Sequence, residues 1–195
     1  AAEVVVESQC QTASEAILAE LRRLPHSLQA PITLPYPHFS SRTVQGKPLH
    51  TWTLEGRLDE IEIPTKTSTI FKLTCTNVRT VSKVEVIKTA LEKIETIPPV
   101  TDERKALGAD FRRTDVRASW AAFAANMSTP STYHIATFTC LASSGTYMRT
   151  LAEVIAKQTG GTGLAFSIHR TKIGRYRQLP FGFGYWSERF LLESA

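Results

Sequence analysis

The side chains of this sequence best suited to chemistry are Tyr147 and Arg149, within the run Ser143 to Glu153. The run follows a predicted strand, Tyr133 to Leu141, and opens a helix expected from about Thr146 to Thr159. Small residues before the tyrosine let the backbone approach a ligand closely. An aromatic ring beside a fixed positive charge suits a flipped base next to an anion. A plain strand-to-helix turn with an exposed arginine has the same pattern, so spacing alone leaves both interpretations open.

Other segments predict the elements that must position this run. Strands are expected at Val4 to Val6 and at Ile70 to Thr76, where apolar and polar residues alternate. Capping patterns at Thr12–Glu15 and Ser82–Glu85 predict two helix starts, and Thr114 is expected to cap a third helix. The expected apolar stripes of these helices are Ile17, Leu21 and Leu24; Val84, Ile87, Leu91 and Ile94; and Val116, Trp120 and Phe123.

Prolines and glycines divide these elements. Pro25, Pro98–Pro99 and Gly160–Gly161 are expected to end helices. Residues 31–48 hold four prolines and predict a long ordered loop, while the aromatic segment Phe181 to Trp186 is expected to cover an edge of the core. The mixture predicts one α+β domain with a mixed, mainly antiparallel sheet and flanking helices.

Charge and cysteine usage narrow the classes of function. A net charge of +5 and a pI of about 9.2 permit a polyanionic partner without requiring one. The basic groups are Arg170, Lys172, Arg175 and Arg177 around Tyr176, and Arg112, Arg113 and Arg117. Such groups neutralise phosphates, although a solvated basic face has the same composition. Three scattered cysteines without a C-x-x-C pair argue against a structural zinc site. The sequence has no apolar run of membrane-spanning length and no signal-peptide pattern, so a cytoplasmic protein is expected.

Three segments, in order, resemble one known family. The run at Ser143–Leu151 resembles S-x-G-T-Y-x-R-S/T-L, and Ile168–Gly174 is similar to L-R-R-T-x-x-G. Upstream, Pro37–Ser41, Gly46–Leu49 and Glu55–Gly56 resemble P-x-x-S-A, G-K-x-L-Y and A-R-x-G. These are signatures of the TruB family of tRNA pseudouridine-55 synthases, and their joint occurrence in the right order is fairly specific.

The resemblance implies a single pseudouridine-synthase-like domain over residues 1–195. Residues 31–60 would form a thumb-like RNA-binding segment, and residues 77–131 a helical insertion. The implied partner is the T-arm stem-loop of tRNA, with no cofactor and no metal, and the complete protein is expected to be a monomer. The implied catalytic residues are Tyr147 and Arg149, and the implied substrate-binding residues are Lys47, Ser144, Gly145, Ile168, Arg170 and Lys172.

The family's essential aspartate has no counterpart in the sequence. It lies in a G-x-x-D-P-x-A-x-G motif, and none of Asp59, Asp102, Asp110 and Asp115 has the following proline or flanking glycine. The expectation is therefore a chain that lacks the N-terminal aspartate-bearing segment and is inactive alone. Ser144 stands where the family often has lysine, Leu54 replaces an arginine, and Ile168 replaces a leucine. Two alternatives stay open: a non-catalytic RNA-binding or ribonucleoprotein subunit on the same fold, and a protein-interaction module that uses the aromatic C-terminus.

Overall fold

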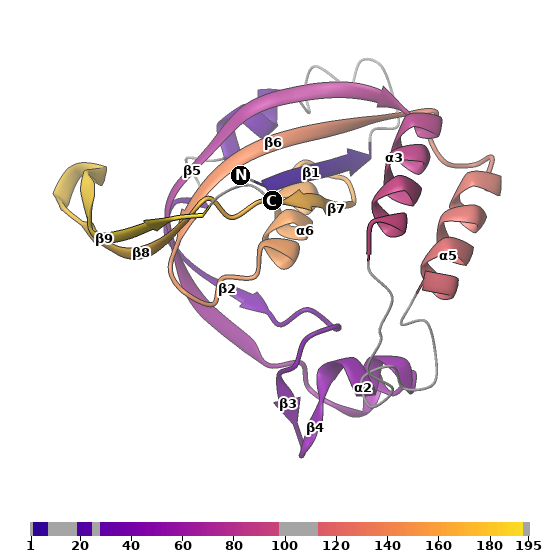
Figure 1. Ribbon diagram of the computed structural model, residues 1–195, viewed down its shortest axis with the longest axis horizontal. Coiled ribbons are helices and arrows are strands. Elements are labelled where there is room, and N and C mark those ends of the chain that lie inside the picture. Colours follow the sequence, from indigo (N-terminus) through magenta and orange to yellow (C-terminus); the bar gives the residue numbers. More distant parts are fainter. Residues whose placement is uncertain (1, 8–18, 25–27, 98–112, 193–195) are drawn as a thin grey trace.

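A five-stranded antiparallel sheet forms the centre of the molecule. The computed structural model describes residues 2–7, 19–24, 28–97 and 113–192. The strand order is β2-β5-β6-β1-β7, and every neighbouring pair is antiparallel (Figure 1). The strands are β1 (Ala2–Glu7), β2 (Pro31–Pro35), β5 (Thr65–Ser82), β6 (Thr132–Ala142) and β7 (Gly163–Ile168). With the helices described below, this arrangement confirms the predicted α+β class and the antiparallel sheet.

The long pair β5 and β6 carries most of the core. The predicted strand Ile70–Thr76 is right in type but too short, because β5 has 18 residues. The register with β6 shifts between Ile70 and Lys72, so Phe71 is an extra residue in the ladder. This bulge allows Ile70 and Leu73, three positions apart, both to be buried in the same apolar cluster.

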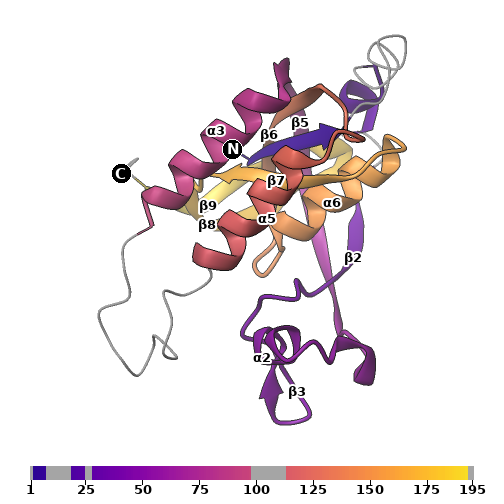
Figure 2. The same ribbon diagram turned by 90° about the vertical axis from the view of Figure 1, so that its right-hand side faces the viewer.

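Helices cover both faces of the sheet. Successive side chains of a strand point to opposite faces of the sheet. Ala136 and Phe138 of β6 pack with Leu151 and Ile155 of α6 (Met148–Gln158), together with the helical residues 19–24. Tyr133 and Ile135 instead join a second cluster with α3 (Lys83–Glu95) and α5 (Arg113–Ala125), which lie side by side in Figure 2.

The predicted helices are present, but their starts and their buried faces differ in places from the predictions. Ser82 caps α3, because its Oγ accepts a hydrogen bond from the Glu85 amide. The predicted stripe is wrong at Val84, which is 74% exposed, whereas Val86 and Ala90 are buried. α5 begins at Arg113, so Thr114 lies inside the helix instead of capping it. The capping pattern at Thr12–Glu15 and the prolines at 25, 98 and 99 fall outside the described residues.

Residues 31–48 are not the long loop that their prolines predicted. They contain β2 and a hairpin of β3 (Thr43–Val44) and β4 (Lys47–Pro48), followed by α2 (Leu49–Leu54) and a short 3-10 helix η1 (Leu58–Glu60). Pro31 and Pro35 are tolerated because they end an edge strand that pairs only with β5.

The C-terminal strands form a separate two-stranded ribbon. β8 (Lys172–Gln178) and β9 (Gly184–Leu191) pair only with each other, through a turn with a short 3-10 helix η2 (Pro180–Gly182). The ribbon extends from the body at one end of the long axis (Figure 1). The prediction that Phe181 to Trp186 covers an edge of the core is therefore wrong, since Phe181 is 97% and Phe183 70% exposed.

A buried histidine in β6 makes the stability of the fold dependent on pH. His134 is 2% exposed, and its Nδ1 lies 3.1 Å from Thr80 Oγ1. Burial lowers the pKa of His134. Near the ordinary histidine pKa of about 6.5, the unfolded chain therefore binds more protons than the folded one.

The expected result is a loss of stability as the pH falls below about 6.5, down to the lowered pKa of the folded state. For one proton, the free energy of unfolding changes by at most about 1.4 kcal/mol per pH unit. The non-titrating variant His134→Gln should lose this part of the slope. The measurement is urea unfolding of both proteins between about pH 7 and pH 5. Parallel pH profiles in the two proteins would contradict the prediction.

Candidate functional site

The turn between β6 and α6 is fixed to β5 by its serine. The Ser143 amide donates to the Thr69 carbonyl at 2.9 Å, and the Thr69 amide donates back to Ser143 Oγ at 2.9 Å. Thr146 Oγ1 donates to the Ser143 carbonyl at 2.8 Å and closes the turn. The start of α6 is thus held at a defined place over the end of the sheet.

The backbone conformation of this turn favours glycine at position 145, and a lysine side chain lies close to it. The φ of Gly145, +81°, lies in the left-handed region, and a Cβ there would overlap the ammonium group of Lys66. The prediction that small residues here let the backbone approach a ligand stays a prediction. The group that approaches is a lysine of β5, so positive charge lies directly against the turn.

Tyr147 and Arg149 face the segment that follows β2. The rings of Tyr147 and Tyr36 meet edge to face, with centroids 5.2 Å apart. The guanidinium of Arg42 lies 5.4 Å from the centre of the Tyr36 ring. Arg149 Nη2 donates a hydrogen bond of 3.0 Å to the Phe39 carbonyl. The structure therefore brings the two predicted catalytic residues together at one place, among aromatic rings and cations.

A second contact joins the same two segments. Thr150 is buried, and its Oγ1 donates to the Pro35 carbonyl at 3.1 Å across 115 residues of sequence. Next to Phe39, Ser40 is 7% exposed, and its Oγ has no hydrogen-bond partner among the described residues. A buried hydroxyl without a partner is unusual and is available to a water molecule or a ligand.

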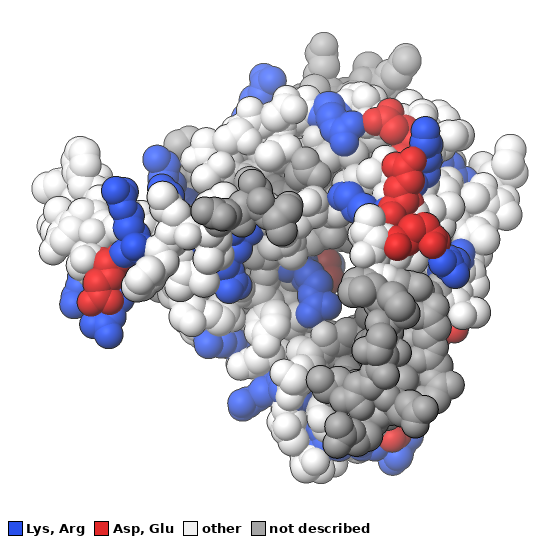
Figure 3. All heavy atoms as spheres, viewed as in Figure 1, with Lys and Arg blue, Asp and Glu red and all other residues white. Residues whose placement is uncertain are grey.

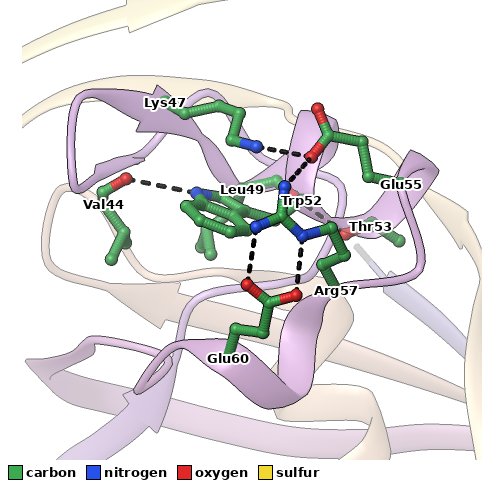
Figure 4. A network of polar contacts seen from close by, with 8 residues as sticks. All are labelled: Val44, Lys47, Leu49, Trp52, Thr53, Glu55, Arg57 and Glu60. Atoms are coloured by element: carbon green, nitrogen blue, oxygen red, sulfur yellow. Dashed lines mark hydrogen bonds and ion pairs between the residues drawn. The ribbon is translucent and has the colours of Figure 1, made fainter.

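Lys47 lies elsewhere, in a polar network around Trp52 (Figure 4). Its Nζ is 2.5 Å from Glu55 Oε2 and 3.8 Å from the centre of the Trp52 ring. Arg57 bridges Glu55 and Glu60, with its guanidinium 5.3 Å from the same ring. Hydrogen bonds from Lys47 and Arg57 lower the pKa of Glu55 and Glu60, respectively, so both carboxylates are ionised at neutral pH. Lys47 is already paired here, and its predicted role in substrate binding stays a prediction.

The other predicted substrate-binding residues lie toward the ribbon. Ile168 ends β7 and is 49% exposed, and Arg170 and Lys172 are exposed where the chain enters β8. Ser144 lines a cleft of about 440 Å³ between the β6–α6 turn and the ribbon. The remaining lining residues are Phe71, Leu141, Ala142, Ser143, Gly174, Arg175, Tyr176, Arg177 and Trp186. The predicted residues thus fall into three places: the start of α6, the Trp52 network and the base of the ribbon.

Sequence reasoning missed Tyr36, Arg42 and Lys66. No local pattern connects them with Tyr147, because they belong to the Pro-rich segment after β2 and to β5. Of the aspartates that the structure describes, Asp59 lies in η1 and Asp115 in α5, and neither pairs with Arg149. In the described part of the chain Arg149 forms no ion pair, so its charge is free to meet an external carboxylate or phosphate.

Metal and thiol chemistry find no support in the described residues. These residues contain no group of three His, Cys, Asp or Glu side chains placed to hold a metal ion. Burial raises the pKa of Cys140 to about 11 and also raises that of Cys75, so both thiols stay protonated at neutral pH. Within the described ranges, no helix combines the length and the apolar character needed to cross a bilayer.

Comparison with known proteins adds no relative. No protein-family model matches the sequence, and no curated protein matches it.

Proposed function

We propose that the chain is the greater part of a tRNA pseudouridine synthase of the TruB type, acting in the cytoplasm on uridine 55 of the T-loop. The observation that carries the proposal is the contact between two of the segments that resemble this family. The segment that contains Pro37–Ser41 meets the run that begins at Ser143 through the Arg149–Phe39 hydrogen bond, across 110 residues of sequence. Agreement between independent sequence matches and spatial contact supports a common site.

The arrangement suits a base that has left its helix. Tyr147 offers an aromatic ring beside Tyr36, and Arg42, Lys66 and Arg149 supply positive charge near these rings and the turn. Stacking on an aromatic ring and neutralisation of phosphates are the two main contributions to binding of unpaired nucleotides. In the resembling family an aspartate attacks the nucleotide. Arg149, whose partner among the described residues is the Phe39 carbonyl, would orient that carboxylate and keep it ionised.

The test is release of tritium from tRNA labelled at carbon 5 of uracil. The 195-residue chain alone is expected to release none, because no aspartate of the sequence matches the catalytic motif. The product of the complete reading frame is expected to release it, if that frame encodes the missing motif. Turnover by the 195-residue chain alone would disprove the assigned role of the missing aspartate. Absence of both turnover and T-arm binding in the complete product would disprove the proposal.

A non-catalytic RNA-binding subunit is the second candidate. It is favoured by one observation, the lack of an ion pair on Arg149 among the described residues. A complete reading frame without a G-x-x-D-P motif, whose product still binds the T-arm stem-loop, would establish this alternative. Under both proposals the RNA meets the same surface.

A further inference from the structure

The β8–β9 ribbon has two unlike faces. One face carries Tyr176 and Trp186, which are half-buried, with ring centroids 5.6 Å apart. The Tyr176 ring also lies 5.3 Å from the ring of Phe71 in β5. This face anchors the ribbon to the end of the main sheet.

The opposite face points to solvent. Residues paired across an antiparallel ribbon share a face, and successive residues of one strand point to opposite faces. The register pairs Ile173 with Phe190, Arg175 with Glu188, and Arg177 with Tyr185. These six residues form what is here named the outer face. Phe190 is 68% and Tyr185 54% exposed, so large rings alternate with charged groups in full contact with water.

The ribbon also carries most of the net charge of the protein. The ribbon, residues 172–191, contains four basic residues and one acidic residue, a net charge of +3 out of +5 for the whole chain. The acidic residue, Glu188, lies 3.5 Å from Arg175. In Figure 3, most of the visible Asp and Glu side chains lie on the side of α3, at the other end of the molecule. Protein interfaces are depleted of charge at their centres, whereas a polyanion requires such a concentration of cations.

The turn at the end of the ribbon extends the aromatic row. Phe181 is 97% exposed and holds a φ of +62°, a conformation that bulky residues seldom adopt. Phe183 beside it is 70% exposed. Exposed rings among arginines on a projecting ribbon match the combination that binds unpaired nucleotides: stacking on bases and neutralisation of phosphates.

We propose that the outer face of the ribbon binds single-stranded nucleic acid. Bases stack on Tyr185 and Phe190, and Arg177 contacts a phosphate. This surface differs from the site around Tyr147 and Arg149, because its rings, Tyr185 and Phe190, do not line the cleft beside the β6–α6 turn, although Arg175 and Arg177 do. It requires no isomerase activity, so its test and the test of the proposed function succeed or fail independently.

The experiment measures fluorescence anisotropy of a labelled oligo(U) RNA of about 12 nucleotides, a length within known single-strand site sizes. The same probe annealed to its complement serves as the duplex. The full 195-residue chain is expected to bind the single strand more tightly than the duplex. Tyr185→Ala and Phe190→Ala should each weaken binding about 10-fold, and Arg177→Gln should reduce the slope of log affinity against log salt by about 0.7.

Matched controls lie on the other side of the molecule. Met127→Ala removes an apolar side chain that is 93% exposed, and Lys88→Gln removes a charge from α3. Both should bind the single strand like the parent chain. Equal affinity for duplex and single strand, unchanged in Tyr185→Ala and Phe190→Ala, would overturn the proposal in favour of a non-specific phosphate contact. No binding of the single strand, together with a change of oligomeric state in the aromatic variants on sedimentation, would assign the outer face to a protein partner instead.

Discussion

Under the proposed function, replacement of Arg149 by lysine is expected to reduce kcat of the complete reading-frame product on the order of 100-fold. Arginine presents a planar fork that fixes a carboxylate through two hydrogen bonds, whereas lysine offers a mobile point charge. A carboxylate held by one mobile donor is displaced by about 1 Å, which is enough for a loss of this size. The measurement is tritium release under single-turnover conditions, with the complete reading-frame product as the parent enzyme.

The thermal midpoint separates this effect from a structural one. Arg149 is exposed, and its hydrogen bond to the Phe39 carbonyl needs only one donor, which lysine also supplies. The midpoint of Arg149→Lys should therefore stay close to that of the parent. Near-normal kcat in this variant would mean that Arg149 does not orient a catalytic group. A large fall in the midpoint would instead assign the arginine to holding the segment after β2.

Removal of the Trp52 ring is expected to unfold the segment from β3 to η1. Trp52 is 6% exposed, its Nε1 donates to the Val44 carbonyl at 3.2 Å, and Lys47 covers its ring. Loss of a buried tryptophan to alanine costs about 3–5 kcal/mol. Few other apolar side chains of this segment are buried, so Trp52→Ala should lower the stability of the segment by most of that amount.

Hydrogen–deuterium exchange of the amides of residues 43–60 measures this loss. Exchange in the main sheet should change little, because the Trp52 ring belongs to neither apolar cluster of the sheet. Trp120→Ala in α5 is the matched control, since it removes a half-buried ring from a different place. If the amides of residues 43–60 are protected equally in Trp52→Ala and in the control, the charge network of this segment does not depend on the Trp52 ring.

Local signals in the sequence predicted the helices better than the strands. Ser82 and Gly160 mark the start of α3 and the end of α6 through bonds made within a few residues, and both were identified correctly. Val84 was placed on the wrong face because α3 packs through Val86 and Ala90, a choice made by the sheet and by α5. The buried residues Val86, Ala90 and Ile94 also stand at helical spacing, so the sequence offered two apolar stripes and tertiary packing selected one.

In the candidate site too, residues close in sequence were predicted, and residues brought together by strand pairing were not. Tyr147 and Arg149 were found because they stand next to each other in one turn. Tyr36 and Lys66 were missed because their position beside that turn depends on pairing between β2, β5 and β6, which is not local. The ribbon was misjudged for a related reason: its aromatic residues predicted burial, but Tyr176 contacts a ring of the body, Phe71, and Trp186 packs on Tyr176, while Phe181 and Phe183 stay exposed.

The position of β1 within the sheet has a consequence for biosynthesis. β1 lies between β6 and β7, and its Ala2 pairs with both Phe138 and Ile168. At translation rates of about 5–20 residues per second, this valine-rich strand waits roughly 10–30 s for its second partner to leave the ribosome. The sheet therefore closes only after residue 168 has left the ribosome, and its long-range pairing makes that closure slow. During this interval the edge of β1 that later pairs with β7 stays unpaired, and an unpaired strand edge is prone to aggregation.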